Sequence, residues 1–158
     1  MNFVNGQRAS KVVSDLLYGA QLDTIRVYSL IIQLGFVCLG RASSLPNEVW
    51  ISISGTLLVE GGTSTVRELA SSRDFFACRA SILGDVYQLI GQEVAAANVS
   101  DLGVLEIHLG GCRLRAEADD TDLEEVWSVV SDSPEPTVDH QWYVVLDDSG
   151  VISVRAPY

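Results

Sequence analysis

The chain has 158 residues, of which 47% are hydrophobic and 20% are charged, and its net charge is −11. This length favours a single domain over 1–158, and the composition excludes a largely disordered chain. Apolar runs stay shorter than the roughly 18 residues that suggest a membrane span. The N-terminus lacks a basic stretch followed by an apolar core, so we expect a cytoplasmic protein with no membrane partner.

The charge is distributed unevenly along the chain. Residues 1–80 carry seven basic and six acidic side chains, whereas residues 81–158 carry three basic and fifteen acidic ones. Such a field repels nucleic acid and attracts basic partners, so we expect no nucleic-acid partner. Ordinary solubility charge is the alternative explanation.

The first third of the chain predicts one helix followed by strands. Apolar residues recur at helical spacing near the N-terminus: Ala9, Val12, Val13, Leu16 and Leu17. They predict a helix over about 8–18 that ends before Gly19. The β-branched stretch 22–34 predicts two strands with a tight bend near Tyr28, and residues 36–47 predict a connection.

The middle of the chain predicts a strand, a loop and a second helix. Alternating apolar residues predict a strand over 49–53, which Gly55 breaks before Leu57–Val59 resumes it or pairs back with it. Residues 61–65 predict a loop. A capping box and helical spacing then predict a helix over about 72–89.

The last third of the chain predicts strands joined by short turns. The predicted strands cover 94–99, 105–109, 112–116, 126–130, 142–146 and 151–155. Strands 105–109 and 112–116 form a hairpin, across which Glu106 or His108 can meet Arg113 or Arg115.

Together these elements predict an α+β fold with about two helices and eight to ten mostly antiparallel strands. The predicted core includes apolar residues from both halves: Ile51, Ile53, Phe76, Val86, Leu105, Ile107, Leu114, Val126 and Val145. Trp50, Trp127 and Trp142 are each expected in the core rather than at an interface.

An internal echo suggests a duplicated β unit, with halves over 1–62 and 88–158 joined by the helix at 72–89. Gly19 aligns with Gly91, Leu22 with Val94 and Val27 with Val99. Chance similarity among short apolar strands is the alternative.

The sequence holds few candidates for catalysis. His108 and His140 belong to no metal-ligand pattern, and Lys11 is the single lysine, so we expect no catalytic residue, no metal and no cofactor. Cys38, Cys78 and Cys112 are widely spaced, which favours reduced thiols, with the last two as small apolar fillers.

An acidic segment holds six carboxylates in nine residues, from Glu117 to Glu125. A calcium site there lacks the glycine of an EF-hand loop, so a solvated connection or a surface for a basic partner is favoured over a metal. The candidate partner-binding residues combine these carboxylates with one aromatic residue: Glu117, Asp119, Asp120, Asp122, Glu124, Glu125 and Trp142.

The second half also resembles a known class of proteins. The stretch 89–94, the hairpin 105–116 with Gly110–Gly111 at its turn, and the Trp-bearing strand after Glu124 are similar to those of small β-rich immunity proteins of bacterial polymorphic-toxin and contact-dependent growth inhibition systems. The resemblance extends loosely to 16–60. It implies a non-catalytic toxin neutraliser and assigns no functional residue.

The residues and the resemblance therefore leave two functions of different classes open. The first is a cytoplasmic immunity protein that occludes the active site or substrate cleft of a cognate toxin domain, a nuclease being one candidate because nucleases present basic clefts. The second is an enzyme or small-ligand binder whose site assembles from distant residues, with Glu106, Cys112, Asp139 and His140 as the first groups to test.

Overall fold

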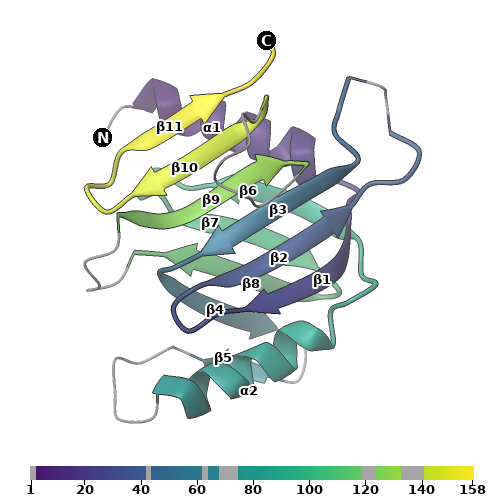
Figure 1. Cartoon of the computed structure of the whole chain (residues 1–158), viewed down its shortest axis with the longest axis vertical. Helices are drawn as coiled ribbons and strands as arrows, with labels where there is room; N and C mark the ends of the chain where they lie inside the picture. The colour runs from purple at the N-terminus through teal and green to yellow at the C-terminus, as the bar shows by residue number, and fades with distance from the viewer. Residues whose placement is uncertain (1–2, 42–43, 62–63, 68–74, 119–123, 133–140) are drawn as a thin grey trace.

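A computed structural model gives the fold of the chain and describes all residues except 1–2, 42–43, 62–63, 68–74, 119–123 and 133–140. Two antiparallel sheets and two helices surround one hydrophobic core (Figure 1). The predicted α+β class is confirmed.

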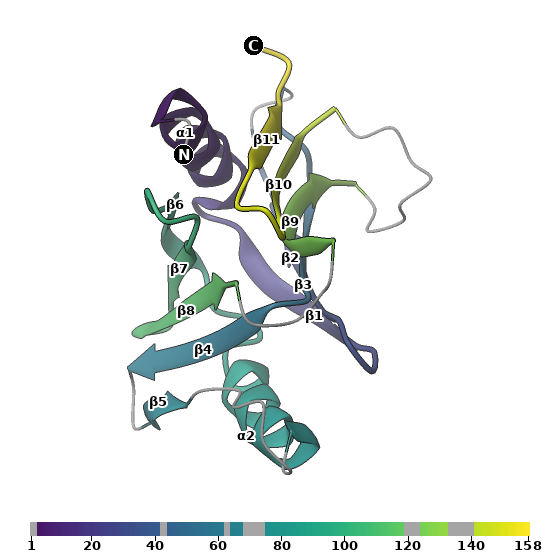
Figure 2. The same cartoon turned by 90° about the vertical axis from the view of Figure 1, so that its left-hand side faces the viewer.

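The first sheet, sheet A, contains six strands. Their order is β1 (Gln21–Val27), β2 (Ile32–Val37), β3 (Glu48–Ile53), β9 (Glu125–Ser131), β10 (Tyr143–Asp147) and β11 (Ile152–Arg155). Sheet B contains five strands, in the order β5 (Ser64–Arg67), β4 (Thr56–Gly61), β8 (Cys112–Glu117), β7 (Leu105–Leu109) and β6 (Val94–Val99). Figure 2 shows the two sheets facing each other, and buried side chains of both sheets form the core.

The core forms where alternating side chains of both sheets face each other. In the middle of sheet A, Leu34 pairs with Ile51, and Ile51 pairs with Val129. In sheet B, Ile107 pairs with Leu114 in the same way. All five side chains are at most 2% exposed. This burial follows from strand periodicity, which places every second residue on one face.

Most predicted core residues are buried as expected. Eight of them are at most 6% exposed: Ile51, Ile53, Val86, Leu105, Ile107, Leu114, Val126 and Val145. The side chain of Phe76 lies outside the described part of the chain. The three tryptophans are also buried, at 4% exposed or less.

The helices lie at opposite sides of the sheets. Helix α1 (Phe3–Leu17) begins five residues before the predicted start and ends as predicted, and its apolar stripe packs against the edge strands β6 and β11. Helix α2 (Phe75–Tyr87) packs against β4 and β5, and the predicted residues before Phe75 lie outside the described part. The two helices occupy opposite ends of the view in Figure 2.

Three local predictions in the first half were wrong. Strand β2 continues to Val37 into the predicted connection, and β5 occupies part of the predicted loop 61–65. Strand β4 neither resumes β3 nor pairs with it, because the chain crosses at Gly55 into the other sheet. An added Cβ at Gly55 would lie 2.3 Å from the carbonyl oxygen of Glu117, so only glycine fits this crossing.

The strand order is symmetric under exchange of the two halves. Sheet A runs β1-β2-β3 and continues with β9-β10, whereas sheet B runs β6-β7-β8 and continues with β4-β5. Each sheet therefore combines three strands of one half with two further strands of the other, and sheet A has β11 in addition.

Two reciprocal hydrogen bonds connect the two copies of the internal echo. Gly19 N donates to Val94 O at 3.0 Å, and Gly91 N donates to Leu22 O at 2.8 Å. Both glycines have positive φ, and strands β1 and β6 are each irregular directly after these contacts. This arrangement is what a duplicated unit would give, and the origin by duplication stays a prediction.

Candidate functional site

One end of the molecule gathers the features that suit a binding surface. In sheet A, a row of paired residues crosses the strands near this end: Ile32, Ile53, Trp127, Leu146 and Ile152. The connections beyond this row lie together on the left of Figure 1 and face the viewer in Figure 2. We call this end the strand-end surface and define it by twelve residues: Val27, Tyr28, Leu30, Ile31, Asp101, Leu102, Glu117, Glu124, Glu125, Asp147, Asp148 and Val151.

The apolar part of this surface is the connection between β1 and β2. Val27, Tyr28 and Leu30 are each more than half exposed, and Ile31 is 36% exposed. The turn is closed by the backbone, because Tyr28 N donates to Ile31 O at 2.8 Å. We call Val27–Ile31 the apolar tip.

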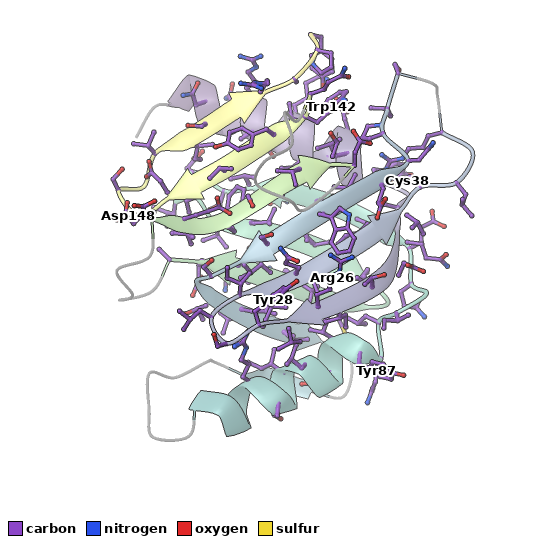
Figure 3. The ribbon with its side chains drawn as sticks, in the orientation of Figure 1. Arg26, Tyr28, Cys38, Tyr87, Trp142 and Asp148 are labelled. Atoms are coloured by element: carbon purple, nitrogen blue, oxygen red, sulfur yellow. The ribbon has the colours of Figure 1, made fainter. Side chains whose placement is uncertain are left out.

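The acidic part of the surface lies at the other strands of sheet A. Asp147 is opposite Glu125 in the β10–β9 pairing, and Asp148 N donates to Glu124 O at 3.2 Å. Glu124 and Asp148 are exposed, as Figure 3 shows for Asp148 at the end of the β10–β11 hairpin. Four carboxylates thus meet within one turn and one strand start.

Asp147 has a structural role within this acidic part. Its Oδ1 accepts hydrogen bonds from Ser149 Oγ at 2.7 Å, Ser149 N at 3.0 Å and Val151 N at 2.8 Å. The hydroxyl of Ser149 and these backbone amides hold the pKa of the Asp147 carboxyl below its usual value. The ionised form therefore fixes the turn that presents Asp148.

The β6–β7 connection completes the surface from sheet B. Asp101 and Leu102 are exposed there, Leu102 at 84%. The connection is anchored to sheet A, because Trp127 Nε1 donates to Gly103 O at 2.9 Å and Gly103 approaches Leu146. Both members of this hydrogen bond are buried, which makes the anchor rigid.

The predicted partner-binding residues are distributed over three locations. Glu117, Glu124 and Glu125 lie on the strand-end surface, and Asp119, Asp120 and Asp122 lie outside the described residues. Trp142 lies at the opposite end of sheet A from Asp148 (Figure 3). It is 4% exposed there, and its ring packs edge-on against the ring of Tyr158 with the ring centroids 5.4 Å apart.

The outer face of sheet B carries a network of ion pairs, as the predicted hairpin suggested. Arg115 lies opposite Glu106, with Nε 3.3 Å from Oε1, and it also approaches Glu60 and Glu117 at 3.4 and 3.5 Å. Glu60 further accepts hydrogen bonds from Arg113, which lower the pKa of this carboxyl. These charges satisfy one another within the sheet.

The residues of the enzymatic alternative do not converge where the structure describes them. Glu106 belongs to the outer network of sheet B, whereas Cys112 packs against the core on the other face. Asp139 and His140 lie outside the described residues. Within the described part of the chain, no three His, Cys, Asp or Glu side chains group as metal ligands.

The apolar half of the surface was not among the residues predicted from the sequence. The stretch around Tyr28 was predicted as a bend, and its apolar residues looked like ordinary strand residues. A usable signal was present, because the four-residue turn Tyr28-Ser29-Leu30-Ile31 holds one residue that is usual in turns, Ser29, beside a tyrosine and two aliphatic residues. Apolar residues in such a turn indicate side chains with a purpose outside the core.

Comparison of the chain with protein-family models, curated proteins and solved structures found no match. None of the helices in the described part is long and apolar enough to cross a membrane.

Proposed function

We propose that the protein is a cytoplasmic immunity protein that binds a bacterial toxin domain and occludes its active site or substrate cleft. The observation that carries the proposal is the strand-end surface, where exposed carboxylates and exposed apolar side chains share one end of the fold. Protein interfaces combine these features, since apolar and aromatic residues supply affinity and charges supply steering and specificity.

The sign of the charge favours a basic partner. Six of the twelve residues that define the surface are carboxylates and none is a lysine or arginine, although one of the six, Glu117, is already paired with Arg115 at 3.5 Å. Nucleases must present basic clefts to hold phosphates, so a nuclease domain is the toxin class that this surface would fit best. An acidic protein can occupy such a cleft in place of the nucleic acid.

A growth assay tests the proposal directly. The toxin domain encoded in the adjacent reading frame is expressed alone and together with this protein. We expect growth arrest in the first case and rescue in the second. Absence of a toxin domain next to the gene, or arrest that co-expression leaves unchanged, would show that the proposal is wrong.

A charge variant then tests the surface itself. Exposed ion pairs contribute ~0–1 kcal/mol each, so neutralising Glu124, Glu125 and Asp148 to Gln, Gln and Asn should weaken toxin binding by about 1–2 kcal/mol. The salt dependence of the affinity should fall as well. Glu93→Gln is the control, because Glu93 is an exposed carboxylate at the opposite end of β1. There its backbone forms an isolated β-bridge with Gln21.

A further inference from the structure

We infer that the apolar tip is the anchor of this interface and inserts into an apolar pocket that lies beside a basic patch on the protein partner. The inference rests on the proposed function and deepens it, because it assigns the chemistry of the partner surface. Four residues carry it: Val27, Tyr28, Leu30 and Ile31.

The tip is held in a fixed shape despite its exposure. Its turn is closed by the Tyr28 N to Ile31 O hydrogen bond, and Val27 pairs with Ile32 at the base of the hairpin. From below, Arg79 of α2 donates from Nη1 to Ser29 O at 2.5 Å. The Arg79 side chain is only 4% exposed, so this hydrogen bond from a buried guanidinium holds the loop in position. A preorganised loop loses little entropy on binding, which favours affinity.

The fold does not require an apolar sequence at this position. Under the exchange of halves, the β1–β2 connection corresponds to the β6–β7 connection, which reads Ser100-Asp101-Leu102-Gly103. That connection closes through Ser100, whose backbone N bonds to Val104 O and whose hydroxyl accepts from Val104 N. This five-residue connection, 100–104, forms its turn with Ser100, Asp101 and Gly103 and only one exposed apolar side chain, Leu102, so a run of exposed apolar side chains like that of the tip is not needed to form the hairpin.

The kind of partner follows from what lies next to the tip. The β1–β2 and β10–β11 hairpins are centred four strand spacings apart in sheet A, which separates the tip from the Asp147–Asp148 turn by roughly 19 Å. A stable interface buries ~800 Å² on each partner, more than four partly exposed side chains supply, so the acidic part must join the contact. The matching partner surface is an apolar pocket with basic residues roughly 19 Å away.

A membrane is the other class of surface that an apolar hairpin can enter. The carboxylates on the same end of the molecule disfavour it, because anionic lipid headgroups repel them. Vesicles therefore serve as one arm of the test.

The experiment measures the affinity of the adjacent-frame toxin domain for the full chain and for two variants. The tip variant is Y28S/L30S, in which both changed side chains are more than half exposed in the wild type. The control is Leu39→Ser, because Leu39 is 89% exposed but follows β2 at its other end. Circular dichroism and thermal unfolding verify that both variants fold.

We expect the tip variant to bind at least about 30-fold more weakly, with an unchanged salt dependence, and the control to bind like the wild type. Equal binding by the tip variant and the wild type would overturn the tip inference and leave the proposed function intact. No binding by the wild type would overturn both. Sedimentation of the wild type with vesicles of phosphatidylcholine and phosphatidylglycerol, lost in the tip variant, would show that the tip serves a membrane instead.

Discussion

The anchor of the β6–β7 connection makes the sharpest prediction about stability. Trp127 is fully buried, and its Nε1 donates to the buried carbonyl of Gly103 at 2.9 Å. In Trp127→Phe this carbonyl loses its donor, which costs about 1–3 kcal/mol. The smaller ring also leaves a cavity that adds about 1 kcal/mol. We therefore expect the free energy of unfolding to fall by about 2–4 kcal/mol.

Thermal and urea unfolding, followed by circular dichroism, measure this effect. For a chain of this length each kcal/mol corresponds to about 2–4 °C, so the melting temperature should fall by about 4–16 °C. Trp50→Phe is the control, because Trp50 Nε1 donates to the partly buried carboxylate of Glu48 at 3.0 Å, where water can replace it. A loss in Trp50→Phe as large as that in Trp127→Phe would refute the reasoning.

Three further predictions concern the contribution of single residues to the stability of the fold. Asp147→Asn should lower the urea midpoint at pH 7 and have less effect at pH 3. The pKa of the Asp147 carboxyl is lower in the folded state than in the unfolded state. Its stabilisation is therefore present above the unfolded pKa and is lost as pH falls through the folded pKa. Equal effects at both pH values would contradict this. Gly55→Ala should lower the free energy of unfolding by more than about 2 kcal/mol, because the added Cβ meets the Glu117 carbonyl. Gly84→Ala in α2 should raise it by up to ~1 kcal/mol, because the space at its Cβ position is open. Similar unfolding midpoints for the two variants would contradict the crossing at Gly55. Lys11→Met should lower the thermal unfolding midpoint only slightly, because the Lys11 ammonium is exposed and water screens its contacts with the Asp15 carboxylate and the Tyr158 hydroxyl.

The sequence predicted the elements whose pattern is local. The helix ending at Leu17 and the hairpin of Glu106 and Arg115 follow from periodicities of 3.6 and 2, which need no tertiary information. The path of the backbone after Gly55 does not follow from such a pattern. Crossing into a second sheet depends on the close approach of Glu117, which is 62 positions further along the chain.

The candidate site was predicted only in its acidic part. Charge can be counted along the sequence, so Glu124 and Glu125 were found, but a count does not show which end of a sheet they occupy. The apolar tip was missed because exposure depends on the position of β1 at the sheet edge, and Tyr28 reads like a strand residue. Trp142 was grouped with the carboxylates as an aromatic anchor for a basic partner, and the length of β10 places it at the other end.

Hydrogen–deuterium exchange of the full chain, with and without the adjacent-frame toxin domain, tests the central claim most directly, because it maps the contact surface without mutation. We expect protection of amides at the strand-end surface, in 27–31, 101–103, 124–126 and 147–151. We expect no change at the opposite end, in 18–20, 38–40 and 90–93. Protection confined to the opposite end, with the strand-end surface unchanged, would contradict the account.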